Sequence, residues 1–179
     1  MLAAGHPLHG LEERREQAML DEPVVALAEA VGRAALGRGI RIATAESCTG
    51  GLIAGAITAV AGSSDWFECG FVTYSNAAKM RDLGVAGETI ERFAAVSVEV
   101  ARAMAEGARR VSGAEWSVAV TGIAGPAGGT PQKPVGTVCF AWAGPRGSEG
   151  LRSLLAGDRA GIRAESVRIA LQGLLDRLA

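Results

Sequence analysis

Residues 44–51, Thr-Ala-Glu-Ser-Cys-Thr-Gly-Gly, place a serine where an apolar run gives way to a helical pattern. The apolar run covers residues 40–45 and a pattern of small residues covers 52–60, so the chain turns sharply from a strand into a helix at Ser47. Backbone N–H groups at a helix start attract anions and developing negative charge, which would favour a nucleophilic serine. The alternative is that Ser47 or Thr49 only caps the helix, which is the commoner role of these residue types.

Tyr74 and Lys79 flank the next strand-to-helix turn in the chain. If Ser75 or Asn76 caps a short helix over residues 77–83, Lys79 lies in its first turn, where the helix dipole disfavours a cation. That position and partial burial would lower the pKa of the lysine, so the amine could accept a proton at neutral pH. The alternative, which the spacing alone favours, is a solvated lysine beside an ordinary strand tyrosine.

The segment that begins at Thr121 is richer in glycine than a connection needs. Glycines let the backbone approach a ligand closely, and consecutive N–H groups form an anion-binding nest. The segment lacks the ending of a P-loop and the spacing of a Rossmann fingerprint, and the alternative is a mobile connection. Its candidate binding residues are Thr121, Gly122, Gly125, Gly128 and Gly129. Lys133, further along, is either a phosphate contact or a surface lysine.

Two arginines, Arg159 and Arg163, are four residues apart near the start of the last predicted helix and therefore share a face. Two cations beside a helix N-terminus are unfavourable unless an anion joins them. Asp158 or a substrate phosphate could supply that anion. A surface pair between Asp158 and an arginine explains the pattern equally well.

Cys48 is a rival nucleophile, because it adjoins Ser47 and shares the positive helix end that lowers a thiol pKa. Small buried cysteines are common, and no histidine is available to pair with this one. We therefore rank Cys48 below Ser47. The backbone N–H groups of Cys48 and Thr49 are instead the candidate oxyanion donors.

Composition excludes several classes of protein. Both histidines, His6 and His9, lie outside the apparent core, so neither a Ser-His-Asp triad nor a zinc site is expected. The net charge of −1 argues against a nucleic-acid partner, and no apolar run is long enough to cross a membrane. The 3 cysteines lack metal-ligand spacing and fit a reducing, cytoplasmic location better than a disulfide framework.

Strands and helices alternate along the sequence. Strands are expected over residues 40–45, 66–75, 116–121, 135–143 and 150–155. Helices are expected over residues 22–36, 51–61, 77–83 and 88–93, and after Ser97 and Asp158. This order predicts a single-domain α/β fold, a three-layer α/β/α sandwich with a mixed, mostly parallel sheet. Ligands of such sheets bind beyond the carboxyl ends of the parallel strands, where the loops after the first three strands should meet.

Residues 1–21 give no sustained apolar face and are interpreted as a flexible N-terminal extension, which leaves residues 22–179 for the folded domain. The periodic pattern begins just after Met19, so we hypothesise that Met19 is the true initiator.

Four motifs, in this order, resemble the C-terminal domain of the CinA (competence/damage-inducible) proteins. The resemblance covers nearly everything from residue 24 to the end. Its motifs are residues 45–51, residues 70–76 with Lys79 and 83–85, residues 119–126 with 128–129 and 133–138, and residues 157–159 with Ile162 and Arg163.

Stand-alone members of this family are nicotinamide-nucleotide amidases, which convert nicotinamide mononucleotide (NMN) to nicotinate mononucleotide and ammonia in pyridine-nucleotide recycling. The resemblance implies a Ser-Lys dyad of Ser47 and Lys79 with nearby Tyr74, and an acyl-enzyme intermediate. It further implies that Thr121 and either Arg159 or Arg163 line the pocket, and that no metal or organic cofactor is needed. A homo-oligomer is suggested only by the family.

Two other functions remain open at this stage. The first is a non-catalytic nucleotide-binding or regulatory module, which would keep the glycine-rich segment without needing Ser47, Lys79 and Tyr74 together. The second is a Ser-Lys amidohydrolase that acts on another amide, because the choice of NMN rests on the family resemblance alone.

Overall fold

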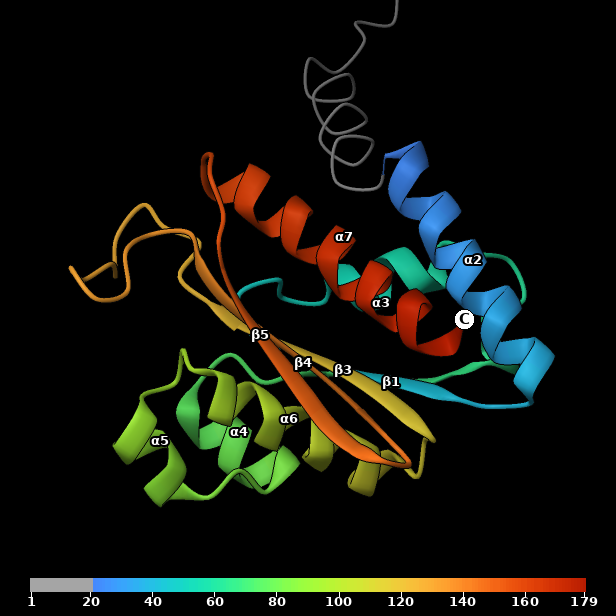
Figure 1. Cartoon of the computed structure of the whole chain (residues 1–179), viewed down its shortest axis with the longest axis horizontal. Helices are drawn as coiled ribbons and strands as arrows, with labels where there is room; N and C mark the ends of the chain where they lie inside the picture. The colour runs from blue at the N-terminus through green and yellow to red at the C-terminus, as the bar shows by residue number, and fades with distance from the viewer. Residues whose placement is uncertain (1–20) are drawn as a thin grey trace, which may run out of the picture.

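Five strands form one mixed sheet, in the order β2–β1–β3–β4–β5, in the computed structural model, which describes residues 21–179 (Figure 1). β1 (Ile42–Glu46) pairs in parallel with β2 (Phe67–Val72) and β3 (Trp116–Gly122). β4 (Thr137–Gly144) pairs antiparallel with β3 and with β5 (Gly147–Leu154). The predicted α/β fold with a mixed sheet is confirmed, and the strands of its parallel part are β2, β1 and β3.

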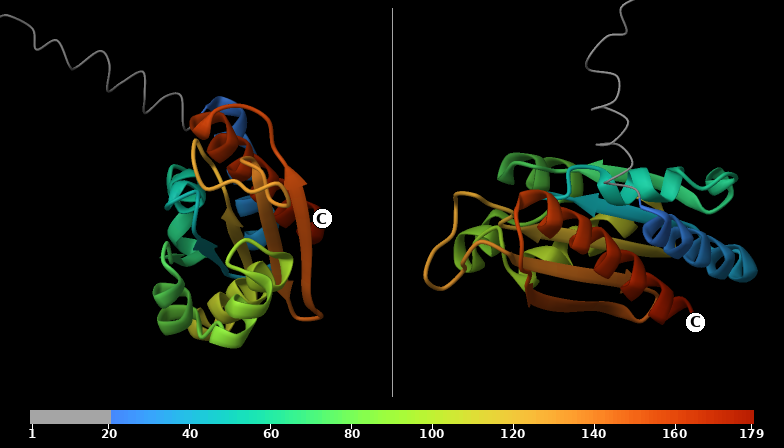
Figure 2. Two further views of the ribbon diagram at one scale, coloured as in Figure 1. Left: turned by 90° about the vertical axis from the view of Figure 1, so that its left-hand side faces the viewer. Right: turned by 90° about the horizontal axis from the view of Figure 1, so that it is seen from above.

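Helices cover both faces of this sheet (Figures 1 and 2). One face carries α2 (Glu22–Arg38), α3 (Leu52–Thr58) and α7 (Arg159–Leu178). The other carries α4 (Asn76–Leu83), α5 (Gly87–Phe93) and α6 (Val98–Ser112). A short 3₁₀ helix, η1 (Ser63–Asp65), leads into β2. Each layer of helices buries its own apolar cluster against the sheet, which gives the three-layer sandwich two cores.

The carboxyl ends of the three parallel strands meet at one edge of the sheet. β1 is buried at every position, as a strand covered on both faces must be, and Glu46 at its end is in register with Val72 and Val120. The residues that follow these three positions, Ser47, Thr73 and Thr121, are therefore neighbours in space. The predicted strand over 66–75 ends early, at Val72.

Side-chain caps fix where four of the helices begin. Asp21 accepts from Val24 N, Ser97 from Val100 N and Asp158 from Gly161 N, as the sequence predicts. For α4 the cap is Ser75, which accepts from Ala78 N at 3.1 Å, and not Asn76. The Asn76 side chain therefore takes no part in capping α4.

The predicted extension and the hypothesis about Met19 concern residues that lie, except for Asp21, outside the described range. Within residues 21–179, none of the helices has the length and apolar character needed to span a bilayer.

Gly107 lets α6 pack closely against the end of α4. A Cβ atom at this position would collide with the Leu83 carbonyl oxygen, whereas one at Gly37, in the last turn of α2, would have no heavy atom within 4 Å. We expect Gly107→Ala to lower the free energy of unfolding by about 1–3 kcal/mol through overpacking. Gly37→Ala should instead raise it by about 0.5–1 kcal/mol, because alanine favours helices.

Denaturant unfolding of both variants beside the wild type measures this difference. Equal effects of the two substitutions would contradict the close packing at Gly107.

Candidate active site

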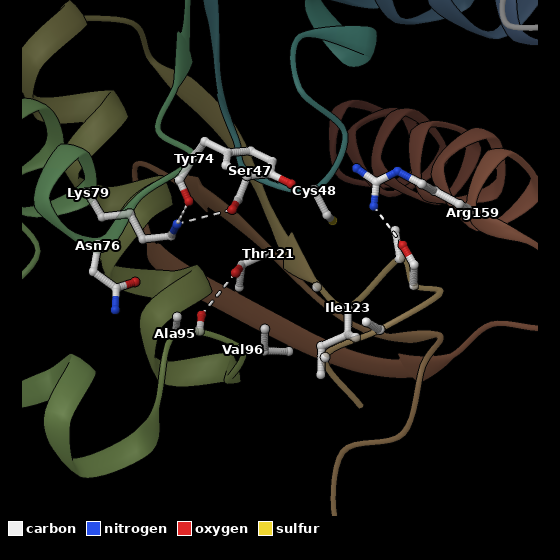
Figure 3. A pocket seen from close by; sticks show the side chains of 15 residues that line it. Ser47, Cys48, Tyr74, Asn76, Lys79, Ala95, Val96, Thr121, Ile123 and Arg159 are labelled. Atoms are coloured by element: carbon white, nitrogen blue, oxygen red, sulfur yellow. Dashed lines mark hydrogen bonds between the residues drawn. The ribbon is translucent and has the colours of Figure 1, made fainter. Parts of the chain in front are cut away.

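Ser47 and Lys79 lie side by side at the carboxyl edge of the sheet (Figure 3). Lys79 Nζ is 3.0 Å from Ser47 Oγ, 2.8 Å from the Thr73 carbonyl oxygen and 3.3 Å from that of Tyr74. Only 1% of Lys79 is exposed. The early end of β2 leaves both carbonyl groups pointing at the amine rather than into the sheet.

These contacts can be made by a neutral amine as well as by an ammonium ion, and burial favours the neutral form. Burial lowers the pKa of Lys79 from its ordinary value, because the charged form loses hydration. A neutral amine has two hydrogens and one lone pair, so it can donate to the two carbonyls and accept from the Ser47 hydroxyl. Within residues 21–179, no carboxylate lies within salt-bridge distance of Lys79 to favour its charged form.

Glu46, and neither Ser47 nor Thr49, caps α3. Its buried carboxylate accepts from Gly51 N at 3.0 Å, Ile53 N at 3.1 Å and Ala54 N at 2.8 Å. The alternative in which Ser47 or Thr49 serves as the helix cap is therefore wrong, and the Ser47 hydroxyl is left to Lys79. The sequence did contain a signal for this role. The N-cap residue of α3 is Gly51, which has no side chain, and the Glu46 carboxylate lies a few residues before it.

The N–H groups of Cys48 and Thr49 donate to no oxygen of any described residue, although both point toward the Cys48 sulfur and favour its thiolate form. They follow Ser47 directly, so they are placed to receive an oxyanion formed at that side chain. The adjacent Gly50 N–H is occupied, because it donates to the Ser47 carbonyl at 3.1 Å. Burial raises the pKa of the Cys48 thiol to about 11, so this thiol stays protonated at neutral pH and is a poor nucleophile.

A cavity of about 290 Å³ opens beside this pair. Most of the predicted site residues line it, namely Ser47, Cys48, Tyr74, Lys79, Thr121, Gly122, Gly125, Gly128 and Arg159. Outside its lining lie Thr49, Gly129 and Arg163. The Tyr74 side chain is 64% exposed, and its hydroxyl forms no hydrogen bond with a described residue, so Lys79 reaches Ser47 without it.

The two arginines of α7 have different positions. Arg159 lines the cavity opposite Lys79 and donates to the Gly125 carbonyl oxygen at 2.8 Å (Figure 3). Arg163 donates at 2.9 Å to the Thr49 carbonyl oxygen, so it supports the turn that carries Ser47. The alternative of a surface pair with Asp158 is wrong, because Asp158 caps the helix and forms no ion pair with either arginine in the described structure.

Cations near the cavity share a feature: each donates to backbone carbonyl groups, and within the described part of the chain none forms a salt bridge with a carboxylate. They are Lys133, Arg159 and Arg163. Because hydrogen bonds to carbonyls do not cancel their formal charge, the surroundings of the cavity favour an anionic ligand.

Outside the glycine-rich segment, sequence reasoning missed three residues that line the cavity; within that segment it also missed Ile123, Ala124 and Ala127. Asn76 stands three residues before Lys79 on α4, so the two share a face, and its carboxamide has no partner among the described residues. Helical spacing from Lys79 could have indicated it. Ala95 and Val96 also line the cavity, but they precede the cap of α6 and carry no polar group that could have marked them.

No group of three or more His, Cys, Asp or Glu side chains in residues 21–179 is arranged to hold a metal ion. The three cysteines are free thiols.

The three-layer fold that positions this serine and this buried lysine is shared with a known protein family. The sequence pattern of the CinA C-terminal domain matches residues 24–178, and the chain belongs to that family. The solved competence/damage-inducible protein CihA of Agrobacterium tumefaciens superposes with a TM-score of 0.86, is 45% identical, and is covered over 96% of its length by 88% of this chain.

This chain covers very different fractions of the lengths of two curated relatives. It is 50% identical to the nicotinamide-nucleotide amidohydrolase PncC of Escherichia coli over 87% of this chain and 95% of that protein. It is 54% identical to a competence-damage inducible protein of Symbiobacterium thermophilum over 84% of this chain, but spans only 39% of that longer protein.

The buried carboxylate of Glu46 predicts a strong effect of a nearly isosteric change. Glu46→Gln removes the charge and turns an NH₂ group toward backbone donors, so we expect the free energy of unfolding to fall by about 2–3 kcal/mol. Glu165→Gln is the matched control, because Glu165 pairs with Arg168 at the surface and should matter by less than about 1 kcal/mol. Denaturant unfolding distinguishes the two, and similar losses would contradict the capping role of Glu46.

Proposed function

We propose that this protein is an amidohydrolase that converts NMN to nicotinate mononucleotide and ammonia through an acyl-enzyme on Ser47. The observation that carries the proposal is the buried amine of Lys79, 3.0 Å from the Ser47 hydroxyl and without a carboxylate partner in residues 21–179. The substrate is suggested by the activity for which the E. coli relative is named, and this chain covers 95% of that protein.

The reaction would begin with proton transfer from the Ser47 hydroxyl to the neutral amine of Lys79. The serine oxygen forms a bond to the carboxamide carbon, and the N–H groups of Cys48 and Thr49 receive the negative carbonyl oxygen. Such donors are worth roughly 3–4 kcal/mol each in comparable sites. The carbon–nitrogen bond then breaks, the departing nitrogen takes the proton from Lys79, and ammonia leaves.

Hydrolysis of the acyl-enzyme would use the same groups. A water molecule attacks the ester carbon while Lys79 accepts its proton, and the proton returns to the Ser47 oxygen as the acid product is released. The direct contact between Lys79 and Ser47 makes a relay through the Tyr74 hydroxyl unnecessary. We assign Tyr74 instead to covering the substrate, because its exposed ring lies at the cavity. No step requires a metal or an organic cofactor.

The phosphate of the nucleotide would lie toward Arg159 and the glycine-rich segment. Arg159 uses one N–H group on Gly125, and its other donors remain for a phosphate oxygen. Gly125 and Gly128 have positive φ angles, 78° and 93°, which let the backbone approach a ligand without a side chain in between. Arg163 and Thr121 hold neighbouring backbone, so their contribution is indirect.

A non-catalytic binding module is the competing function. Such a module has no use for a lysine that is desolvated beside a serine, because burying an unpaired amine costs stability.

The three free cysteines fit the reducing cytoplasm, which we propose as the location. A homo-oligomer is suggested by the family alone.

Ammonia release from NMN by Ser47→Ala and Lys79→Met tests the proposal. We expect a loss of at least about 10³-fold in kcat/KM for Ser47→Ala, because the nucleophile is removed. Lys79→Met should lose about 10²–10⁴-fold through loss of the general base. Ser64→Ala, in η1 and away from the cavity, is the control. Undiminished turnover by Ser47→Ala would remove the nucleophile, and an inactive wild type would favour the binding module.

The protonation of Lys79 predicts the pH dependence of activity. The protonated amine cannot act as a base, so kcat/KM should rise with pH through the pKa of Lys79, which lies below the ordinary lysine value. A pH–rate profile of the wild type measures this step. A profile that falls as pH rises through this range would contradict the role of Lys79.

The same pKa is measurable without turnover. Because burial lowers the folded-state pKa, the unfolded chain binds more protons between the folded and unfolded values, and the wild type gains stability as pH rises through that window. Lys79→Met should therefore be more stable than the wild type below the window, by a margin that shrinks as pH rises.

A further inference from the structure

The wall of the cavity that faces Ser47 and Lys79 is the segment of residues 93–96, between α5 and α6, hereafter the pocket wall. Side chains donate to all four of its carbonyl oxygens. Ser97 Oγ donates to Ala94 O at 2.9 Å. Thr121 Oγ1 donates to Ala95 O at 2.9 Å (Figure 3). Lys133 Nζ donates to the other two, Phe93 O at 2.9 Å and Val96 O at 2.6 Å.

The pocket wall has an unfavourable backbone conformation. Ala94 has φ 63° and ψ 160°, a region that is essentially restricted to glycine, and it is the only non-glycine residue with positive φ in residues 21–179. Such a conformation persists only where the surroundings over-determine it. The hydrogen bonds to the four carbonyl groups supply that constraint, and Lys133 contributes two of them.

What the pocket wall presents to the cavity is apolar. Ala95 and Val96 line the cavity together with Ile123, opposite the polar side formed by Ser47 and Lys79 (Figure 3). An aromatic ring that packs on this apolar side would direct a carboxamide on its edge toward Ser47. The geometry is that of a ring-binding surface facing a reacting group.

Lys133 approaches the pocket wall from outside the cavity. It stands near the end of the glycine-rich segment, and it is absent from the residues that line the cavity. Its ammonium group donates to two carbonyl oxygens of the pocket wall. This arrangement therefore does not favour a contact between Lys133 and a substrate phosphate. Lys133 therefore joins the segment that contacts the nucleotide in the proposed function to the wall that contacts the ring.

We propose that Lys133 is a positioning residue: by bridging the Phe93 and Val96 carbonyl groups, it holds the pocket wall where the aromatic ring of an amide substrate must pack for the carboxamide carbon to reach Ser47. The inference rests on the proposed function. It separates the alignment of substrate from the reactivity of the Ser47–Lys79 pair, because Lys133 contacts neither residue.

Lys133→Met tests this, because methionine has a similar length and no donor. Arg152→Met is the matched control. Arg152, in β5, donates at 2.7 Å to the carbonyl oxygen of Gln132, the residue next to Lys133. The substitution therefore removes a cation that holds the same segment, without touching the pocket wall. Two experiments are carried out on each protein: steady-state kinetics with NMN, which give kcat and KM, and the rate at which a small organophosphorus fluoride modifies Ser47.

For Lys133→Met we expect kcat/KM to fall about tenfold or more, mainly through kcat, because misplacement of a bound substrate by about 1 Å can cost about 100-fold in rate. Modification of Ser47 by the small reagent should keep its wild-type rate, since that reagent does not need the wall. Arg152→Met should match the wild type in both measurements. In Lys133→Ala, added propylammonium ion should restore part of the lost kcat/KM by occupying the vacated site.

Equal kinetics of Lys133→Met and Arg152→Met would overturn the inference. So would a parallel loss of turnover and of Ser47 modification in Lys133→Met, because that result would indicate a general loss of structure. If Lys133→Met does not fold, the propylammonium experiment with Lys133→Ala decides, and no rescue overturns the inference. A wild type that is modified at Ser47 but does not hydrolyse NMN would defeat the proposed function, and this inference with it.

Discussion

A single buried amine imposes most of the constraints on this site. Within the described part of the chain Lys79 has no carboxylate partner, and two backbone carbonyl groups, from Thr73 and Tyr74, accept its hydrogens instead. Those carbonyls are free because β2 ends at Val72 while the chain continues past the end of β1. Desolvation of the amine destabilises the folded state, and it also lowers the pKa of Lys79. The same physical effect therefore costs stability and makes the amine available as a base.

At the turn that carries Ser47, the N–H groups of the α3 N-terminus could compete with Lys79 for the serine oxygen. A helix start offers several N–H groups, and a serine beside it would ordinarily be drawn into capping them. The Glu46 carboxylate takes three of these donors, so it satisfies α3 and leaves the serine oxygen unengaged by the helix. Arg163 then fixes the far side of the turn through the Thr49 carbonyl. The N–H groups nearest Ser47, those of Cys48 and Thr49, belong to the turn and not to the helix, and no oxygen of a described residue accepts from them.

Around the cavity, cations donate to backbone carbonyl groups, and within residues 21–179 they form no salt bridge with a carboxylate. Lys133, Arg159 and Arg163 each tie one connecting segment to another through carbonyl oxygens. This arrangement orders loops that have little apolar content of their own, and it leaves formal positive charge near a site proposed to bind a phosphorylated substrate. The strained backbone at Ala94 lies within this network, where ordered surroundings can maintain it.

The sequence alone determined the alternation of strands and helices, the caps Asp21, Ser97 and Asp158, and the Ser47 and Lys79 segments, because periodicity and capping are encoded within a few residues. Tertiary structure decided which acid caps α3, which arginine faces the cavity and what Lys133 holds. These outcomes depend on contacts between distant segments: Lys79 and Ser47 are 32 residues apart, and Arg163 and Thr49 are 114 apart. Local pattern cannot specify such distances, because only the packing of both helical layers on one sheet sets them.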